Sequence, residues 1–457
     1  MASQVRPRFH GPYIRVLHHR VNKNIPASKS TKAKVRVMKD IFGSIRKTYN
    51  EFPRLFWVVV LTRFIDSLGS TILFPFFSLY VTQKFGVGMM QAGILLGLSS
   101  FFALVGSTFG GALTDRFGRR KIILFGLIFS GLSSLLLGSA NSIKVMYPLI
   151  VVVGLLASVA NPAHEAMLAD ILPESKRQEG YGILRVVFNY AWIVGTAMGG
   201  LIATRSFFAL FEVDATVSCI AAAILFRLLP ETKPQIREET GRKQESFWET
   251  IKGYRVVLRD LAFMGFVLSG MLALIVYIQQ FSSLAVYLRD VHGIDSRGYG
   301  IILSITGLEV VLLQFWISRK IRYRPPFLVM MLGAGIFAIG VFLYGIVSGF
   351  VMFVIAAVIV CLGEMLYFPT SQVVVAGFAP KEMRGRYMAI AGFITSVPNS
   401  IGPGAAGYVL DHLDPHLLWY IGGFLCVISA LGYFGLHLRV GTQGRFVRTA
   451  PKEPAAA

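Results

Sequence analysis

A short charged segment between two long apolar stretches constrains this chain more than any other feature. Residues 111–121 read Gly-Ala-Leu-Thr-Asp-Arg-Phe-Gly-Arg-Arg-Lys, and the stretches 94–113 and 122–137 around them are largely apolar. Roughly 20 apolar residues in a helix cross a bilayer core of about 30 Å. The charged segment is too short to fold as a domain and too basic to lie in lipid, so it must turn the chain at a membrane surface. Its four cations place that surface on the cytoplasmic side.

The composition is also that of a membrane protein. The chain is 54% hydrophobic and only 15% charged, whereas a soluble domain carries about 25% charged residues. Its 45 Lys and Arg outnumber 24 Asp and Glu, which gives a net charge of +21. Because these cations cluster in the tails and in alternate loops, we interpret them as topology determinants that face lipid headgroups, not as a nucleic-acid surface. The three cysteines fall inside apolar spans, so no disulfide, metal site or cofactor is expected.

Apolar runs between charged or Gly/Pro breaks predict twelve membrane helices. Loops rich in Arg and Lys alternate with poorer ones, which places both termini in the cytoplasm. No cleavable signal peptide is evident, and Met38 opens a start-like stretch, so residues 1–37 are either a disordered basic tail or an over-long gene prediction. The expected helix limits are 56–81, 89–113, 121–141, 145–170, 181–203, 207–229, 262–288, 297–318, 327–348, 350–376, 386–410 and 416–438.

The chain repeats itself at a shift of 207 residues. This single shift places Tyr80 on Tyr287, Gly86 on Gly293, Gly93 on Gly300, Pro162 on Pro369, Arg177 on Arg384, Gly195 on Gly402 and Gly200 on Gly407. Such a match predicts one six-helix unit used twice, with a ligand site near mid-membrane where the halves meet. The expected domains are a basic tail (1–54), an N-terminal bundle (55–229), a cytoplasmic linker (230–260), a C-terminal bundle (261–439) and a second tail (440–457).

The order Gly-x-Leu-x-Asp-Arg-x-Gly-Arg-Arg-Lys between two membrane helices resembles the signature loop of the major facilitator superfamily. The resemblance covers about residues 55–440 and implies an all-α membrane fold of twelve helices in two parallel six-helix pseudo-repeats. It also implies a cytoplasmic gate that latches the two halves together when the transporter opens outward. Asp115 is expected to pair with Arg119 or to accept backbone N–H groups, and the glycines to permit a tight turn and close helix approach. The gate residues are Gly111, Asp115, Arg116, Gly118, Arg119 and Arg120.

Small residues in the fifth and eleventh spans resemble the antiporter motif of the same family. The fifth span carries Gly195, Gly199 and Gly200, although Thr196 stands where the motif has Pro. The eleventh span carries the better copy, with Gly402, Pro403 and Gly407. Two interpretations stay open: close helix packing, or a signal for export.

Ionisable residues inside the spans are costly in lipid and are therefore candidates for function. Glu309 and Glu364 sit mid-span without a Lys or Arg within one turn, so we expect them to couple transport to protons or to bind substrate. Arg63, Asp66, Glu165 and Arg185 either form a structural network in the N-half or add proton-coupling sites, with Arg63 and Arg185 as charge partners. Asp170, Asp214, Asp411 and His412 are interpreted as boundary residues. The expected cavity lining is Phe74, Phe76, Phe77, Tyr277, Gln280, Tyr367 and Phe368.

These features predict a secondary transporter of the drug:proton antiporter branch. It would export a small, lipophilic solute by alternating access, as a monomer in the bacterial inner (plasma) membrane. Its partners would be the solute, protons and membrane lipids. Uptake or facilitated transport of a metabolite or lipid remains an alternative, because an Arg common in the fourth helix of drug exporters is missing. A membrane-embedded enzyme and a sensor without transport are rival classes. The chain has no Walker motif, so ATP does not power it directly.

Overall fold

The computed structural model describes residues 49–233, 254–380, 383–441 and 446. Most of the predicted tails and the middle of the predicted linker lie outside these ranges. The membrane helices belong to one compact unit, Arg54–Ala457. Its described secondary structure is entirely helical, without a strand, which confirms the predicted all-α class.

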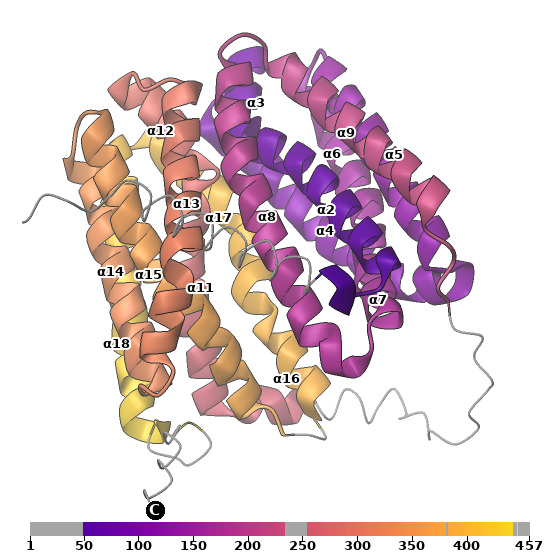
Figure 1. Ribbon diagram of the computed structural model, residues 1–457. Helices are drawn as coiled ribbons and strands as arrows, with labels where there is room; N and C mark the ends of the chain where they lie inside the picture. Colours follow the sequence, from indigo (N-terminus) through magenta and orange to yellow (C-terminus); the bar gives the residue numbers. More distant parts are fainter. Residues whose placement is uncertain (1–48, 234–253, 381–382, 442–445, 447–457) are drawn as a thin grey trace, which may run out of the picture. The chain divides into compact units, whose positions relative to one another are not determined.

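The first half of the chain contains helices α2 to α9 (Figure 1). They are α2 (Arg54–Leu73), η1 (Phe74–Phe76), α3 (Phe77–Phe85), α4 (Met89–Phe117), α5 (Arg119–Ser139), α6 (Ile143–Ala157), η2 (Ser158–Ala160), α7 (Asn161–Ile171), α8 (Glu174–Ala203) and α9 (Phe207–Leu228). The second half contains α11 (Leu261–Tyr277), η3 (Ile278–Gln280), α12 (Ser283–His292), α13 (Ser296–Ile321), α14 (Pro326–Ile346), α15 (Phe350–Phe378), α16 (Arg384–Ala391), α17 (Phe393–His412) and α18 (Pro415–Val440).

Eleven helical segments among the described residues are long and apolar enough to cross a membrane. The remaining predicted span, the eleventh at 386–410, is divided into α16 and α17, and α17 carries Ser, Asn and two internal prolines. It nevertheless packs along α4 and α11, between more apolar neighbours. A helix shielded on both sides needs less apolar surface than one facing lipid. With α17 included, the predicted twelve-helix fold is confirmed.

Three predicted spans are broken where single helices were expected. Short 3₁₀ turns interrupt them at η1, η2 and η3, and the first two breaks adjoin Pro75 and Pro162. Proline removes a helical N–H and clashes with the preceding turn, so it breaks or kinks a helix. The breaks interrupt the α-helical hydrogen bonding inside the predicted spans, which is tolerated where the backbone is buried in protein or lines a cavity.

The two halves repeat each other down to single hydrogen bonds. Gly86 and Gly293 end α3 and α12 with φ of 63° and 65°, a left-handed conformation that favours glycine. The Tyr80 hydroxyl donates to the Leu137 carbonyl at 2.7 Å, and 207 residues later Tyr287 donates to Tyr344 at 3.1 Å. The predicted repeat is therefore present in the tertiary contacts.

Two helix seams join the halves, one between α4 and α17 and the other between α8 and α13. A Cβ added at Gly93 would lie 2.2 Å from the Pro403 carbonyl oxygen in the first seam. At the equivalent place in the second seam, a Cβ added at Gly300 would lie 2.6 Å from the Thr196 carbonyl oxygen. Both helix pairs therefore pack backbone against backbone, as small residues allow.

Candidate functional site

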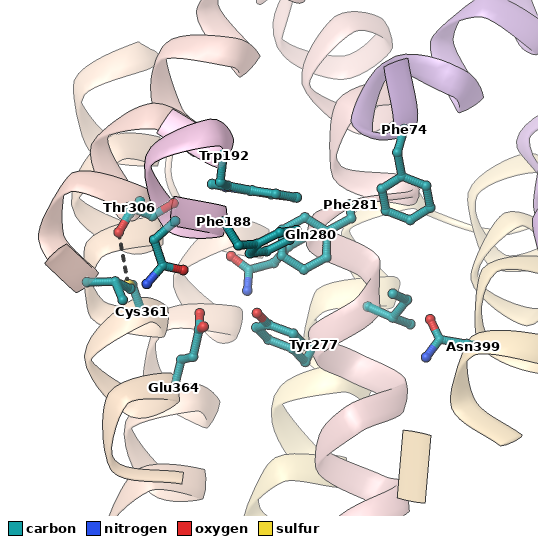
Figure 2. Close-up of a pocket in the computed structure, with 14 residues that line it drawn as sticks. Phe74, Phe188, Trp192, Tyr277, Gln280, Phe281, Thr306, Cys361, Glu364 and Asn399 are labelled. Atoms are coloured by element: carbon teal, nitrogen blue, oxygen red, sulfur yellow. Dashed lines mark hydrogen bonds between the residues drawn. The ribbon is translucent and has the colours of Figure 1, made fainter. Parts of the chain in front are cut away.

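A cavity of about 330 Å³ lies where the two halves meet. Aromatic rings from both halves form most of its wall, and the broken segments η1 and η3 contribute to it (Figure 2). Its polar groups are few, as is typical of small-molecule sites. The lining residues are Phe74, Phe188, Asn189, Trp192, Tyr277, Ile278, Gln280, Phe281, Thr306, Gly307, Val310, Cys361, Glu364 and Asn399.

Glu364 is the carboxyl group of this cavity. It comes from α15, and its side chain points towards the hydroxyl of Tyr277 on α11 (Figure 2). The positive charge that acts on it is that of Arg185, on α8 of the other half. Arg185 therefore lies close enough to act on Glu364, whereas the sequence left open whether it belongs to a network within the N-half. A carboxyl group and a cation from opposite halves thus influence each other electrostatically.

Glu309 lies behind the cavity wall. The residues Thr306 and Val310 of α13 line the cavity, while Glu309 itself is 9% exposed. Neither of its carboxyl oxygens has a hydrogen-bond partner among the described residues. The Cys361 thiol of α15 lies beside it and donates to the Thr306 carbonyl at 3.4 Å. A buried carboxyl without a partner is costly when ionised, so Glu309 is suited to hold a proton.

A second group of buried carboxyls lies in the N-half. Asp214 of α9 is 5% exposed and accepts a hydrogen bond from the Ser134 hydroxyl of α5. A Cβ added at Gly69 would lie 2.5 Å from an oxygen of Asp214, so this glycine makes room for the carboxyl. Asp66 lies one turn before Gly69 and interacts with both Asp214 and Arg63. The interpretation of Asp214 as a boundary residue was wrong, because it lies two turns inside α9 and is buried.

Glu165 belongs to a different contact. The Tyr181 hydroxyl of α8 lies against its carboxyl. The neighbouring His164 is instead close to the charge of Arg63. Among the predicted N-half charges, Asp66 thus lies near Arg63, and Glu165 lies against Tyr181.

The predicted gate is a single-residue turn, not a loop. Helix α4 runs to Phe117 and α5 begins at Arg119, so only Gly118 is non-helical, with φ of 94°. Arg119 pairs with Asp170 at 3.0 Å and more loosely with Asp115 at 3.5 Å. Asp115 is 73% exposed. No described contact joins Asp115 to the second half.

Glu231, not Asp115 as the sequence suggested, accepts hydrogen bonds from the backbone N–H groups at this turn. Its carboxyl accepts from Arg119 N–H at 2.8 Å and from Arg120 N–H at 3.2 Å. This carboxylate therefore caps the N-terminus of α5, where negative charge is stabilising. Gly111 was expected to allow close helix approach, but a Cβ added there would have no neighbour within 4 Å. The close approach is at Gly110 instead, where an added Cβ would lie 2.3 Å from the Val159 carbonyl oxygen.

At one end of the α4–α17 seam, a side chain of the second half caps the N-terminus of a helix of the first half. The Asp411 carboxylate of α17 accepts the N–H groups of Met89 and Met90, both at 2.8 Å. In the repeat, the equivalent helix α13 is capped by its own Asp295, which accepts from Gly298 at 2.8 Å. Gly88 stands where α4 would carry that aspartate. Asp411 does lie at a span boundary, in the last turn of α17, but sequence reasoning missed that it joins the halves at the membrane face opposite the predicted gate.

The predicted aromatic lining is correct in part. Phe74, Tyr277 and Gln280 line the cavity. Phe76 and Tyr367 are buried in the core instead, where Phe76 packs on Tyr299 and the Tyr367 hydroxyl meets that of Tyr433 at 2.8 Å. Phe77 is also a core residue, while Phe368 packs on Tyr277. Sequence reasoning missed Phe188, Trp192 and Asn399. Phe188 and Trp192 lie one turn apart on α8, but helical spacing cannot tell a face that lines a cavity from one that faces lipid.

The sequence matches the Major Facilitator Superfamily over residues 59–344 and 279–456. The chain belongs to this superfamily. Curated relatives include a Na(+), Li(+), K(+)/H(+) antiporter of Planococcus maritimus, 27% identical over 77% of this chain and 89% of that protein. Another is multidrug resistance protein 2 of Bacillus subtilis, 24% identical over 84% and 96%. The chain is a transporter of the superfamily, as predicted.

Solved structures show the same fold. A POT family transporter in complex with 5-aminolevulinic acid superposes with a TM-score of 0.70 at 16% identity, covering 86% of this chain and 97% of that one. The nucleoside transporter NupG superposes with a TM-score of 0.67 at 14% identity, covering 84% and 99%. At these identities the likeness concerns architecture alone.

Proposed function

We propose that this transporter exports a small, lipophilic solute in exchange for protons. The observation that carries the proposal is Glu364, a lone carboxyl in an aromatic cavity shared by both halves. Aromatic faces attract organic cations and apolar bodies, and a carboxylate adds charge recognition. We place the protein in the plasma membrane as a monomer, with both ends in the cytoplasm and the Gly118 turn at the inner face.

In this proposal, solute and proton compete for Glu364. A proton that reaches Glu364 from outside neutralises it and releases the solute, and loss of that proton to the inside restores the binding site. Glu309 holds a second exchangeable proton behind the cavity wall, and Asp66 and Glu165 are further candidates in the N-half. Arg185 makes the charged, empty state of Glu364 less costly, because it supplies a counter-charge from the other half.

The gate acts at the inner face in the same cycle. Asp115 is exposed here while the α4–α17 seam is closed at the opposite face. This arrangement suits a state in which the solute enters from the inside. When the outer face opens, Asp115, Arg116, Arg119 and Arg120 latch the halves at the inner face, with Gly111 then providing the close approach.

A second candidate is exchange of alkali cations for protons, the activity named for the Planococcus maritimus relative. The oxygen atoms of Asn189, Gln280, Thr306 and Asn399 line the same cavity as Glu364, and hard cations bind oxygen ligands. The aromatic wall favours the lipophilic solute.

Transport into proteoliposomes with an imposed pH gradient tests both candidates. Ethidium serves as the lipophilic probe, and Na⁺ and K⁺ as the inorganic ones. Proton-driven accumulation of ethidium supports the main proposal, accumulation of Na⁺ or K⁺ alone supports the second, and movement of none of them contradicts both. Glu364→Gln should lose uphill transport at least tenfold and bind ethidium more weakly, because the amide mimics the protonated acid that releases the solute. Glu212→Gln, at an exposed carboxyl of α9 outside the cavity, is the matched control.

Glu309→Gln separates the two C-half carboxyls. The amide mimics the protonated acid, so uphill transport should fall while solute binding remains. If Glu309→Gln keeps the wild-type pH dependence, coupling belongs to Glu364 or to Asp66.

A further inference from the structure

The turn between α13 and α14 carries cations that have lost their acidic partners. In the N-half, Arg119 pairs with Asp115 and Asp170. The residues 207 positions later are Arg322 and Gly377, so one carboxylate became a cation and the other vanished. Within the described part of the chain, no ion pair engages the cations of this turn. They are Arg319, Lys320, Arg322 and Arg324, and all four are exposed.

An apolar groove opens beside these cations. It has a volume of about 510 Å³ and lies between α13 and α14, with α15 as its floor. Its walls include Trp316 and Leu332, which are 60% and 54% exposed. Lys320 and Arg324 line its end at the turn. The Lys320 ammonium lies 4.8 Å from the ring centre of Trp316.

The groove therefore has the polarity of one half of a bilayer. Its apolar length runs along the membrane helices, and its charged end lies at the surface where the helices turn. Tryptophan is enriched at that boundary, and basic pockets between membrane helices bind anionic headgroups. A soluble anion would leave the apolar walls uncovered, and a zwitterionic lipid would leave the cations uncompensated.

We propose that this groove is a binding site for an anionic phospholipid. The phosphate of the lipid lies between Lys320 and Arg324, and one acyl chain lies along Trp316 and Leu332. The site is separate from the solute cavity, with which it shares no lining residue. It does not depend on the transported solute or on proton coupling.

Native mass spectrometry of the full chain in detergent, titrated with phosphatidylglycerol, tests the proposal. The double variant Lys320→Gln/Arg324→Gln should bind this lipid about 30-fold more weakly, at about 1 kcal/mol for each cation that contacts the phosphate. The control Arg227→Gln/Arg319→Gln removes two exposed cations from the same membrane face that do not line the groove. It should change binding less than about threefold, because salt screens exposed charges that do not contact the lipid. Equal losses in both variants would show diffuse attraction and overturn the proposal, as would no loss in either.

A second pair of variants tests the apolar wall without changing charge. Leu332→Trp fills the groove and should weaken phosphatidylglycerol binding, whereas Ile339→Trp, exposed on the same helix outside the groove, should not. Glycerol phosphate should fail to compete with the lipid. Competition by glycerol phosphate, or equal effects of the two tryptophans, would overturn the proposal. Detergent melting temperatures identify any variant that fails to fold, and the other pair then decides.

Discussion

Replacing Asp411 with Ala should open the face of the transporter opposite the gate. Asp411 holds two N–H groups of α4 at 2.8 Å and is the side-chain cap that this helix receives. Loss of an N-terminal cap costs about 0.5–2 kcal/mol, and the exposure of Asp411 argues for the middle of that range. Because donor and acceptor belong to different halves, about 1 kcal/mol is lost only in the state with this face closed. The ratio of open to closed molecules should rise about fivefold.

Labelling of a buried reporter cysteine measures this ratio. Ser78 of α3 is 1% exposed and donates to the Ser282 carbonyl at 2.7 Å, between the halves. A cysteine at position 78 should react with an impermeant maleimide only when this face opens. Its labelling rate should rise about fivefold in Asp411→Ala, in step with the open population.

The repeat supplies the control. Asp295→Ala removes a cap of the same kind from α13, but that cap lies within one half. It should lower the melting temperature by a similar amount and leave labelling of position 78 unchanged. If both variants raise the labelling rate equally, or if Asp411→Ala leaves it unchanged, the Asp411 cap does not stabilise the closed state of this face.

Three further outcomes are expected. Gly407→Ala should hinder closure of the α4–α17 seam, because its Cβ would lie 2.4 Å from Met90 N. In the control Gly404→Ala, the added Cβ makes only ordinary contacts at 3.6 Å. The labelling rate of a cysteine at position 78 should therefore rise in Gly407→Ala and stay unchanged in Gly404→Ala. Asp115→Asn should slow the initial transport rate at least tenfold without changing the melting temperature, and a full-rate variant would remove the gate role. Asp214→Asn keeps the shape of its site but not its charge; if Asp214 exchanges protons, the ratio of protons to solute should fall, and an unchanged ratio in flux measurements would make the residue structural.

The fold was predictable because its signals lie along the chain. Apolar length predicts a span, charge predicts a turn, and the equal φ angles of Gly86 and Gly293 follow from a repeat visible in the sequence. The broken span near Pro75 was also within reach, since proline alone disfavours a continuous helix. Counting apolar residues missed this break, because the residues on both sides of Pro75 are apolar and extend the predicted span.

The polar contacts were less predictable, because they depend on which helices become neighbours. Asp214 and Asp411 both lie within a few turns of a helix end, and distance along the chain made them look alike. One is buried against Ser134 and the other caps α4 from the opposite half. Glu364 was found by its mid-span position, but its facing Tyr277 and Arg185 could not be read from the sequence. The position of a residue along the chain indicates its depth in the membrane but not which side chain it contacts.

Because α4 is long and reaches both faces of the transporter, movement of one of its ends is coupled to opposite movement of the other. Gly93, at the closed seam, and Asp115, at the gate, are 22 residues apart on this one helix, about 33 Å at 1.5 Å per residue. If the half rocks as a rigid body about the midpoint, a rotation of about 10° moves each end by about 3 Å in opposite directions. That movement is enough to part Gly93 from Pro403 and to carry Asp115 towards the second half. Under such a rotation the opening of one face closes the other.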